Sequence, residues 1–287
     1  LLQAMVRSGF TSVFIGIETP DEDSLELTRK HQNNRKPMSE SLETISRSGL
    51  RVMAGMILGF DNEKNGAGER IVRFVEENAI ATAVISLLQV LPNTGLHTRL
   101  EREQRLTGRV VGAGQMDALN FIPTRPVAEI LREYVDTYRA LYDPERYMER
   151  VKRQFLMVGI DPPFDVTRPP ATGKPPRRSP GTLWRLFLND LRMYRAGAIL
   201  VWRLGIRRSA TRRLFWRNLF EIRRKNPERL VAYLAICAHI EHFTPLVAKV
   251  TIAIEEHIER LAKAGHIVAE PASVPAPVLP RALAGKQ

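Results

Sequence analysis

Residues 1–99 alternate between segments of helical periodicity and short runs of apolar and β-branched residues. Helical segments end at Gly9 and at Gly49, and a third spans residues 68–78. Each precedes a strand-like run, and the three expected strands are residues 11–17, 51–58 and 81–90. Such alternation is typical of βα units around a parallel sheet, so the sequence predicts an α/β fold with three parallel strands.

A polar or glycine-containing turn follows each expected strand. The three turns are Glu18-Thr19-Pro20, Gly59-Phe60-Asp61-Asn62-Glu63 and Leu91-Pro92-Asn93-Thr94-Gly95. In parallel sheets ligands bind at the carboxyl ends of the strands. Glycine and proline in a single turn only mark a loop, whereas three such turns in succession indicate a shared binding edge.

The cysteine content and hydropathy of the chain exclude some classes of protein. Cys237 is the one cysteine, which excludes an internal disulfide framework and an iron–sulfur cluster held by the cysteines of this chain alone. The sequence contains no run of about 18 consecutive apolar residues and no secretory signal, so we expect no membrane-spanning helix. The expected location is the cytoplasm, including the periphery of the inner face of the membrane.

Three segments resemble cobalamin-binding radical S-adenosylmethionine (SAM) proteins. Residues 14–22, with Lys30, Gln32 and Asn33, resemble the fourth-strand segment of that family. Residues 55–61 resemble its fifth-strand glycine motif, and residues 88–96 its sixth-strand segment, with Asn93 in place of a glycine. Residues 117–155 resemble the segment that follows the barrel in the subfamily that includes hopanoid methylases.

This resemblance covers about half of the chain and implies the C-terminal half of a radical SAM partial (β/α) barrel, followed by a basic α-helical region. The chain begins at Leu1 within a helical pattern, and we expect it to be a fragment. The cluster-binding cysteine loop and the cobalamin domain of the family would then lie upstream. The expected units are a partial barrel with strands four to six (1–115), a helical post-barrel extension (116–161), a Pro/Arg-rich linker (162–181), a basic α-helical region (182–266) and a disordered tail (267–287).

The resemblance also implies a SAM site. Glu18 and Thr19 would face the ribose and methionine groups, although Thr19-Pro20-Asp21-Glu22 equally fits a helix capping box. Gly55 and Gly59 would let the backbone approach the ligand, and Ile57 would pack on the adenine. Main-chain groups near Gln89 and Leu91 would bond the adenine edge. Asp61 and Glu63 are left without a role, and no catalytic residue and no metal ligand is assigned.

The implied function is that of a cobalamin-dependent radical SAM enzyme, C-methyltransferase-like, acting on an unactivated carbon of a small molecule or lipid. SAM would bind partly to this chain, whereas the 4Fe-4S cluster and cobalamin would belong to the parent protein and have no ligands here. One alternative is a non-catalytic binding module with a basic helical tail that binds membranes or nucleic acid. A lesser alternative is a radical SAM enzyme that modifies RNA.

The formal charge of +12 comes from one region, because residues 168–229 hold 17 basic and three acidic residues. Residues 182–226 show helical periodicity, with large apolar residues on one side and arginines on the other. Ordinary helix packing, a peripheral membrane surface and a nucleic-acid surface all fit this pattern, and nucleic acid fits it less well. The alternation of large apolar residues with arginine favours the membrane surface over nucleic acid.

The region after this basic segment contains a histidine and cysteine group that does not make a metal site. His239 and His242 are three residues apart, but Cys237 and His257 do not complete a tetrahedral set. We expect ordinary packing for these side chains, and we expect Pro245 to interrupt the helix.

Overall fold

The computed structural model describes residues 1–20, 37–61, 63–108, 119–160 and 195–263. The predicted linker at 162–181, the predicted tail at 267–287 and residues 182–194 of the basic region lie outside these ranges. So do Lys30, Gln32 and Asn33, and with them Asp21 and Glu22 of the expected capping box.

Three parallel strands form the sheet in the order β1-β2-β3, with β2 in the centre. The elements that build it are α1 (Leu2–Arg7), β1 (Ser12–Glu18), α3 (Met38–Arg47), β2 (Arg51–Leu58), α4 (Ala67–Glu77) and β3 (Thr82–Leu87). This arrangement confirms the predicted α/β fold with three parallel strands. It does not show a closed barrel, because β1 has no second strand neighbour among the described residues. β3 ends at Leu87, three residues earlier than expected.

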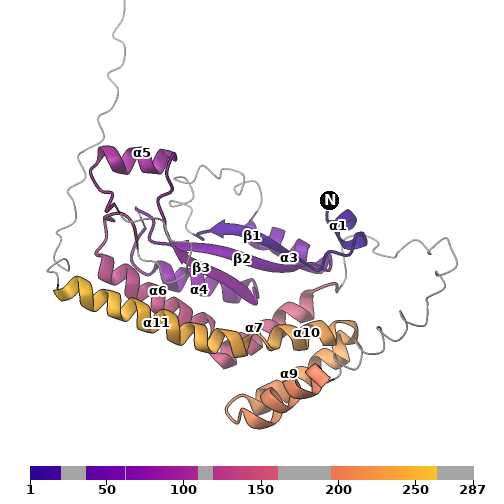
Figure 1. Cartoon of the computed structure of the whole chain (residues 1–287). Helices are drawn as coiled ribbons and strands as arrows, with labels where there is room; N and C mark the ends of the chain where they lie inside the picture. Colours follow the sequence, from indigo (N-terminus) through magenta and orange to yellow (C-terminus); the bar gives the residue numbers. More distant parts are fainter. Residues whose placement is uncertain (21–36, 62, 109–118, 161–194, 264–287) are drawn as a thin grey trace, which may run out of the picture.

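One face of the sheet is covered by helices, and no described helix or strand covers the other, which we call the open face. Along β2, Val52, Ala54, Met56 and Leu58 are buried, and the residues between them are partly exposed. Successive side chains of a strand point to opposite faces, so this alternation separates a core face from an open one. Figure 1 shows α4, α6 and α11 together on one side of the sheet. The core face is therefore the helix-covered one.

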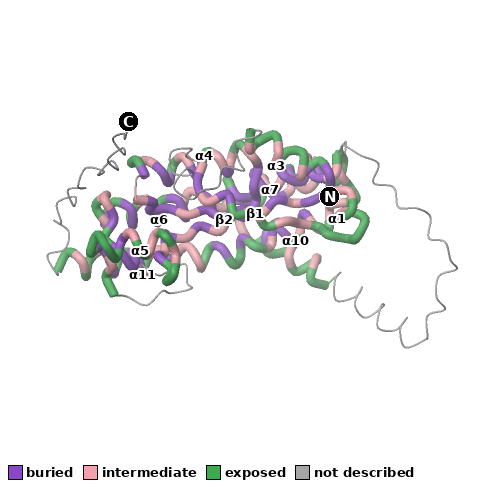
Figure 2. Tube along the Cα trace, turned by 90° about the horizontal axis from the view of Figure 1, so that it is seen from above, coloured by how far each residue is buried: buried purple, intermediate pink, exposed green. Residues whose placement is uncertain are grey.

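The helices after the sheet are α5 (Gly95–Arg102), α6 (Val127–Leu141), α7 (Pro144–Met157), η2 (Arg203–Arg207), α9 (Arg212–Lys225), η3 (Pro227–Arg229), α10 (Leu230–Cys237) and α11 (Ile240–Lys263). The break between α6 and α7 is set by Asp143, whose carboxylate accepts the backbone N–H groups of Glu145 and Arg146. Seen from above, Figure 2 places the buried positions mainly along the strands, α6 and α7.

Tyrosines of α6 cover one edge of β3. Tyr134 and Tyr138 donate hydrogen bonds to the Ile85 carbonyl at 3.2 and 2.7 Å, and Tyr142 donates to the Ala83 carbonyl. Backbone groups two residues apart point to the same side of a strand. The tyrosine hydroxyls thus bind the backbone carbonyls with which a further strand would pair, and the sheet ends at β3.

The C-terminal helices join the same core. On α7, Gln154 donates to the Val52 carbonyl at 3.0 Å, and Tyr147 donates to the Ile236 carbonyl of α10 at 2.8 Å. Asn226, after α9, donates to the carbonyls of Phe155 and Val158 at 2.8 and 3.0 Å. The inner faces of the basic region are therefore packed against α7, as the ordinary packing interpretation predicts, while its outer faces remain free for another role.

Helix α11 contains Pro245, so the expectation that this proline interrupts the helix is wrong. The ring is exposed, and the buried side chains of Phe243 and Val250 hold the helix on both sides of it. Phe243 stacks on Tyr142 with ring centroids 3.9 Å apart. Tertiary packing here outweighs the hydrogen bond that a proline removes.

The helical stretch from Pro227 to Lys263 is long and apolar enough to cross a membrane by length and mean hydropathy, which is 1.4. The sequence prediction counted consecutive apolar residues and missed this stretch, whose apolar residues are interspersed with Glu241, His239 and His242. In this structure Tyr233, Ile240 and Ile254 of the stretch belong to the common core. Length and composition alone are weak evidence for a membrane-spanning helix. The expectation that the chain has no such helix stays a prediction.

Candidate binding site at the carboxyl ends of the strands

The parallel sheet brings the three predicted turns to one edge. Glu18 is the last residue of β1 and pairs with Met56 of β2, and Ile57 lies beside Ser86 of β3. Carboxyl ends of parallel strands share an edge, so the segments that carry Glu18, Gly59 and Leu91 meet there. The seven residues expected to face SAM lie on this edge or on the open face next to it.

The first turn contains a β-bulge that changes the direction of Glu18. The pairing of β1 with β2 shifts between Gly16 and Glu18, and Glu18 has a φ of 71°, in the left-handed region. A bulge reorients a side chain at the end of a strand, and a non-glycine residue with positive φ is held there by its surroundings. Thr19 is buried, with its N–H bonded to the Ile17 carbonyl at 3.0 Å. Glu18 is therefore the more accessible of the two.

Gly55 and Gly16 are neighbours on the open face, and the Phe14 ring lies over Gly55. A Cβ atom on Gly55 would lie 3.0 Å from Cζ of Phe14 and 3.8 Å from Cα of Gly16. Phe14 is 60% exposed, and Ile57 is partly exposed on the same face. An exposed aromatic ring beside a partly exposed isoleucine is an apolar surface on which a flat, aromatic group can lie.

Gly59 has a clear structural function. Its φ is +97°, and its N–H donates to Oε2 of Glu63 at 2.7 Å. Glu63 is itself buried, with Arg125 at 3.7 Å. The glycine is needed for the turn, and the N–H expected near the ligand is used by Glu63.

Asp61 holds the second turn against the segment that follows β3. Its carboxylate accepts a hydrogen bond from Arg99 at 2.8 Å and two from Arg105. Burial opposes the charge on Arg105, but the hydrogen bonds that Arg105 donates to Asp61 and Glu103 outweigh it and raise the pKa of Arg105. Asp61 is thus paired with two guanidinium groups, and Glu63 with the Gly59 N–H and Arg125, so both carboxylates stabilise the turn.

A buried asparagine fixes the third turn. The Asn120 side chain accepts the Val90 N–H at 2.9 Å and donates to the Val90 carbonyl at 3.0 Å. The Leu91 carbonyl accepts from Thr94 at 2.7 Å, and the Leu91 side chain is 52% exposed. Gln89 and Leu91 are thus held on each side of a clamped residue. The sequence reasoning missed Asn120, since an isolated asparagine before an apolar residue gives no signal.

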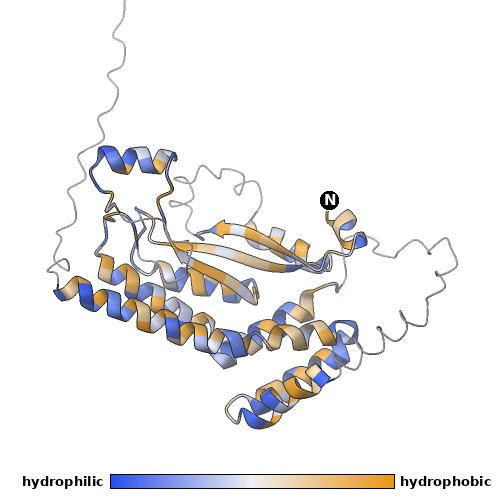
Figure 3. Ribbon diagram, in the orientation of Figure 1, coloured by the Kyte–Doolittle hydropathy of each residue, from blue (hydrophilic) through white to orange (hydrophobic). Residues whose placement is uncertain are grey.

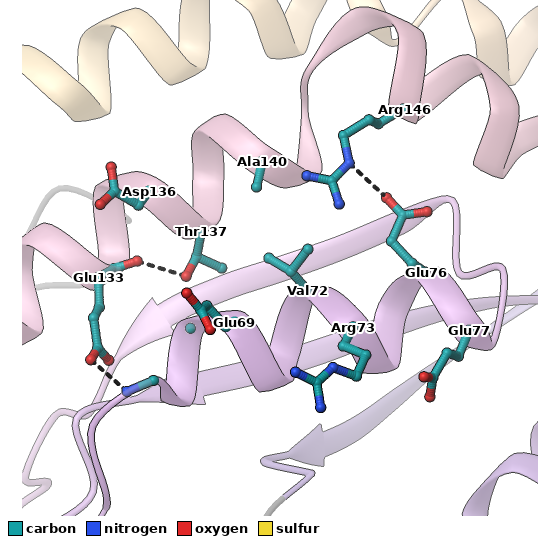
Figure 4. A pocket seen from close by; sticks show the side chains of 12 residues that line it. Glu69, Val72, Arg73, Glu76, Glu77, Glu133, Asp136, Thr137, Ala140 and Arg146 are labelled. Carbon is teal, nitrogen blue, oxygen red and sulfur yellow. Dashed lines mark hydrogen bonds and ion pairs between the residues drawn. The ribbon is translucent and has the colours of Figure 1, made fainter.

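A groove with a volume of about 740 Å³ lies elsewhere, between α4 and α6 (Figure 4). It is lined by five carboxylates and two arginines, namely Glu69, Glu76, Glu77, Glu133, Asp136, Arg73 and Arg146. Glu133 accepts the Gly66 N–H at 2.8 Å, and Arg146 lies 3.8 Å from Glu76. This groove is on the helix-covered side, and its charges are partly paired with each other, so it does not coincide with the expected SAM site.

The described residues bring no three His, Cys, Asp or Glu side chains together in a geometry that could hold a metal ion. Cys237 is buried, and burial raises the pKa of its thiol to about 12. The rings of His239 and His242 contact Phe243, with centroids 6.1 and 5.6 Å apart. Cys237 therefore packs in the core, whereas His239 and His242 are exposed at the surface and lie against Phe243.

Two curated proteins match most of the chain. A protein of Synechocystis sp. described as an uncharacterized methyltransferase is 45% identical over 244 residues, and the hopanoid C-2 methylase of Rhodopseudomonas palustris is 30% identical over 243 residues. The matches cover 85% and 84% of this chain but 42% of each relative, so the chain spans less than half the length of these relatives. No solved structure gives a significant match. The chain is therefore homologous to part of proteins described as methyltransferases.

A family profile matches residues 94–256, from the turn before α5 into α11. It includes Asn120, the α6 tyrosines and the basic helix α9, and it begins after the sheet. The profile is described as a domain of unknown function, DUF4070. Since the match covers more than half of the chain, the chain belongs to the DUF4070 family.

Proposed function

We propose that this chain forms the C-terminal half of the SAM-binding barrel of a cobalamin-dependent radical SAM enzyme that methylates an unactivated carbon. The observation that carries the proposal is the asymmetry of the sheet. The β3 side is closed by Tyr134, Tyr138 and Tyr142, whereas β1 has no strand neighbour on its outer side among the described residues. A sheet closed on one side only is what half of a larger parallel sheet would present.

The open face fits the chemistry of SAM. Its adenine needs an apolar surface and backbone polar groups, which Ile57, Gly55 and the segment around Gln89 supply. Its ribose and amino acid groups offer hydroxyl and ammonium donors, for which the Glu18 carboxylate is a suitable acceptor. Bound there, SAM would supply the one-carbon chemistry, and the residues of this chain would orient it and exclude water.

The chain does not fit the other two cofactors. A 4Fe-4S cluster needs several cysteine thiolates, and the sequence holds Cys237 alone, which is buried among helices. No histidine, cysteine or carboxylate set for a metal occurs in the described ranges. We therefore assign the cluster and the cobalamin to a part of the enzyme outside this chain and derive no step through them.

The proposed substrate class is a polycyclic lipid. One relative is named a hopanoid C-2 methylase, and the open face exposes apolar side chains such as Phe14 at 60%. An unactivated carbon carries no group that an acid or base could use, and the seven residues assigned to the SAM site include no nucleophile and no pair of carboxylates. The proposed location is the cytoplasm.

The test is SAM binding and product formation by the full-length enzyme reconstituted with its cofactors. Ile57→Ala should weaken SAM binding about tenfold, because it removes most of a side chain that would be buried under the adenine. Ile252→Ala is the control with the same change of side chain, since Ile252 is exposed and lies on α11, away from the candidate site. Equilibrium dialysis measures the binding, and mass spectrometry of extracted lipids measures methylation.

The possible results separate the parts of the proposal. Equal SAM affinity of the Ile57→Ala and wild-type enzymes would contradict the assigned pocket. Absence of any SAM binding by the reconstituted enzyme would instead favour a non-catalytic binding module. Binding and turnover of SAM with no methylated lipid would refute the substrate class alone.

A further inference from the structure

The stretch from Arg195 to Lys225 combines strong positive charge with exposed apolar side chains. Residues 195–225 contain ten basic residues and one acidic residue, Glu221. Four large apolar side chains are exposed in the same stretch: Ile199 at 45%, Trp202 at 50%, Ile206 at 54% and Phe220 at 63%. Neither the fold nor the proposed reaction uses these outer side chains.

Helix α9 separates these residues into two faces. Phe215, Asn218 and Ile222 are buried against the rest of the protein. Phe220 projects on the opposite side, where helical spacing of three, four and seven residues also places Arg217, Arg224 and Arg213. All four side chains on this outer face are exposed. Figure 3 shows the resulting alternation of polar and apolar residues along α9.

The aromatic residues of this surface are held in place by the fold. Trp216 donates to the Gly205 carbonyl at 2.8 Å, and its ring lies 6.0 Å from that of Phe220. The Arg207 guanidinium is 5.9 Å from the centre of the Trp202 ring. η2 therefore packs on α9 and presents its own exposed residues next to an ordered aromatic pair.

Most of the charges on this surface have no acidic partner among the residues that the structure describes. Arg217 pairs with Glu149 at 3.1 Å and Arg203 lies 3.7 Å from Glu241. No carboxylate within the described ranges pairs with Arg212, Arg213, Arg223 or Arg224. Four exposed guanidinium groups without an acidic neighbour favour an anionic partner.

We infer that the outer face of η2 and α9 binds the surface of an anionic lipid bilayer. Isoleucine and tryptophan side chains beside arginines match the boundary between headgroups and acyl chains, where arginine reaches the phosphates and apolar groups enter the hydrocarbon. A nucleic acid would also attract the arginines, but its surfaces are polar and wet and make no use of Ile199 and Ile206. Figure 1 shows α9 at the end of the molecule opposite α5, so this surface is separate from the candidate SAM site.

The experiment is sedimentation of the full chain with vesicles of phosphatidylcholine alone or mixed with phosphatidylglycerol, over a series of salt concentrations. We expect binding to the anionic vesicles only, weaker at high salt. Arg213→Gln combined with Arg224→Gln should reduce the partition coefficient by about fivefold for each arginine. Phe220→Ala, which leaves the charge unchanged, should reduce it by about tenfold.

The matched control is Arg73→Gln combined with Arg132→Gln, which removes the same charge from exposed positions on α4 and α6. This control should bind vesicles nearly as well as the unchanged chain. Equal losses in the two double variants would show attraction by net charge alone and overturn the inference. So would unchanged binding of the Phe220→Ala variant together with a mobility shift of single-stranded RNA that requires Arg213 and Arg224.

Discussion

The tyrosine hydroxyls on α6 allow a sharp comparison of two buried hydrogen bonds. Tyr142 donates to the Ala83 carbonyl, whereas Tyr138 donates to the Ile85 carbonyl, which also accepts from Tyr134 at 3.2 Å. Replacing either residue by phenylalanine keeps the ring and removes the hydroxyl. After Tyr138→Phe the Ile85 carbonyl keeps a donor, but after Tyr142→Phe the Ala83 carbonyl loses its phenol donor.

The two variants should therefore differ in stability. Tyr138→Phe loses one hydrogen bond, and its free energy of unfolding should fall by about 1 kcal/mol. Tyr142→Phe also leaves a buried acceptor without this partner, and the fall should be about 2–3 kcal/mol. The stacking of residue 142 on Phe243, at 3.9 Å, is retained and does not contribute to the difference.

Denaturation of the full chain in urea, followed by circular dichroism, measures both values. The slopes of the unfolding curves should match that of the unchanged chain, since neither variant alters the surface exposed on unfolding. A Tyr138→Phe variant as unstable as Tyr142→Phe, or more so, would refute the argument that the second donor protects the Ile85 carbonyl.

Three further predictions concern the core and the turns. Burial raises the pKa values of Tyr138, Tyr142 and Tyr233 above the ordinary value. Their contribution to the free energy of unfolding is therefore complete below about pH 10 and is lost as the pH rises further. Unfolding curves at alkaline pH should show this loss of stability, and the loss should be smaller in the Tyr142→Phe variant. Asp61→Asn should lower the free energy of unfolding by about 3 kcal/mol, because it leaves the Arg105 guanidinium without its buried carboxylate. Glu43→Gln, at an exposed pair with Arg47, should lower it by less than about 0.5 kcal/mol. Equal losses of stability in urea denaturation would contradict this prediction. Gly59→Ala should cost about 1–2 kcal/mol because of the positive φ at that position, and a neutral result in the same assay would show that the turn relaxes.

The parts of the fold that follow from local pattern could be predicted from the sequence. Gly9 and Gly49 mark the ends of α1 and α3, and the β-branched runs became the three strands of the sheet. The end of β3 was predicted too late, because Asn120, thirty residues further along, clamps Val90 out of the strand. Pro245 was misjudged for a similar reason, since Phe243 stacks on Tyr142 from a distant helix. Contacts of this kind depend on tertiary structure, and no local pattern contains them.

In the candidate site, too, the positions of the residues could be predicted from the sequence, but their partners could not. Which residues lie at the carboxyl ends of the strands follows from the order of elements, and Gly55, Ile57 and Leu91 are where that order places them. What each residue is free to do depends on its partners: Gly59 and Asp61 are occupied by Glu63, Arg99 and Arg105. The acids that follow the glycine motif are thereby used to stabilise a turn, which leaves the open face with apolar side chains such as Phe14 and Ile57. A face of that composition can orient a ligand and exclude water, and the reactive groups for the proposed methylation have to be supplied by cofactors.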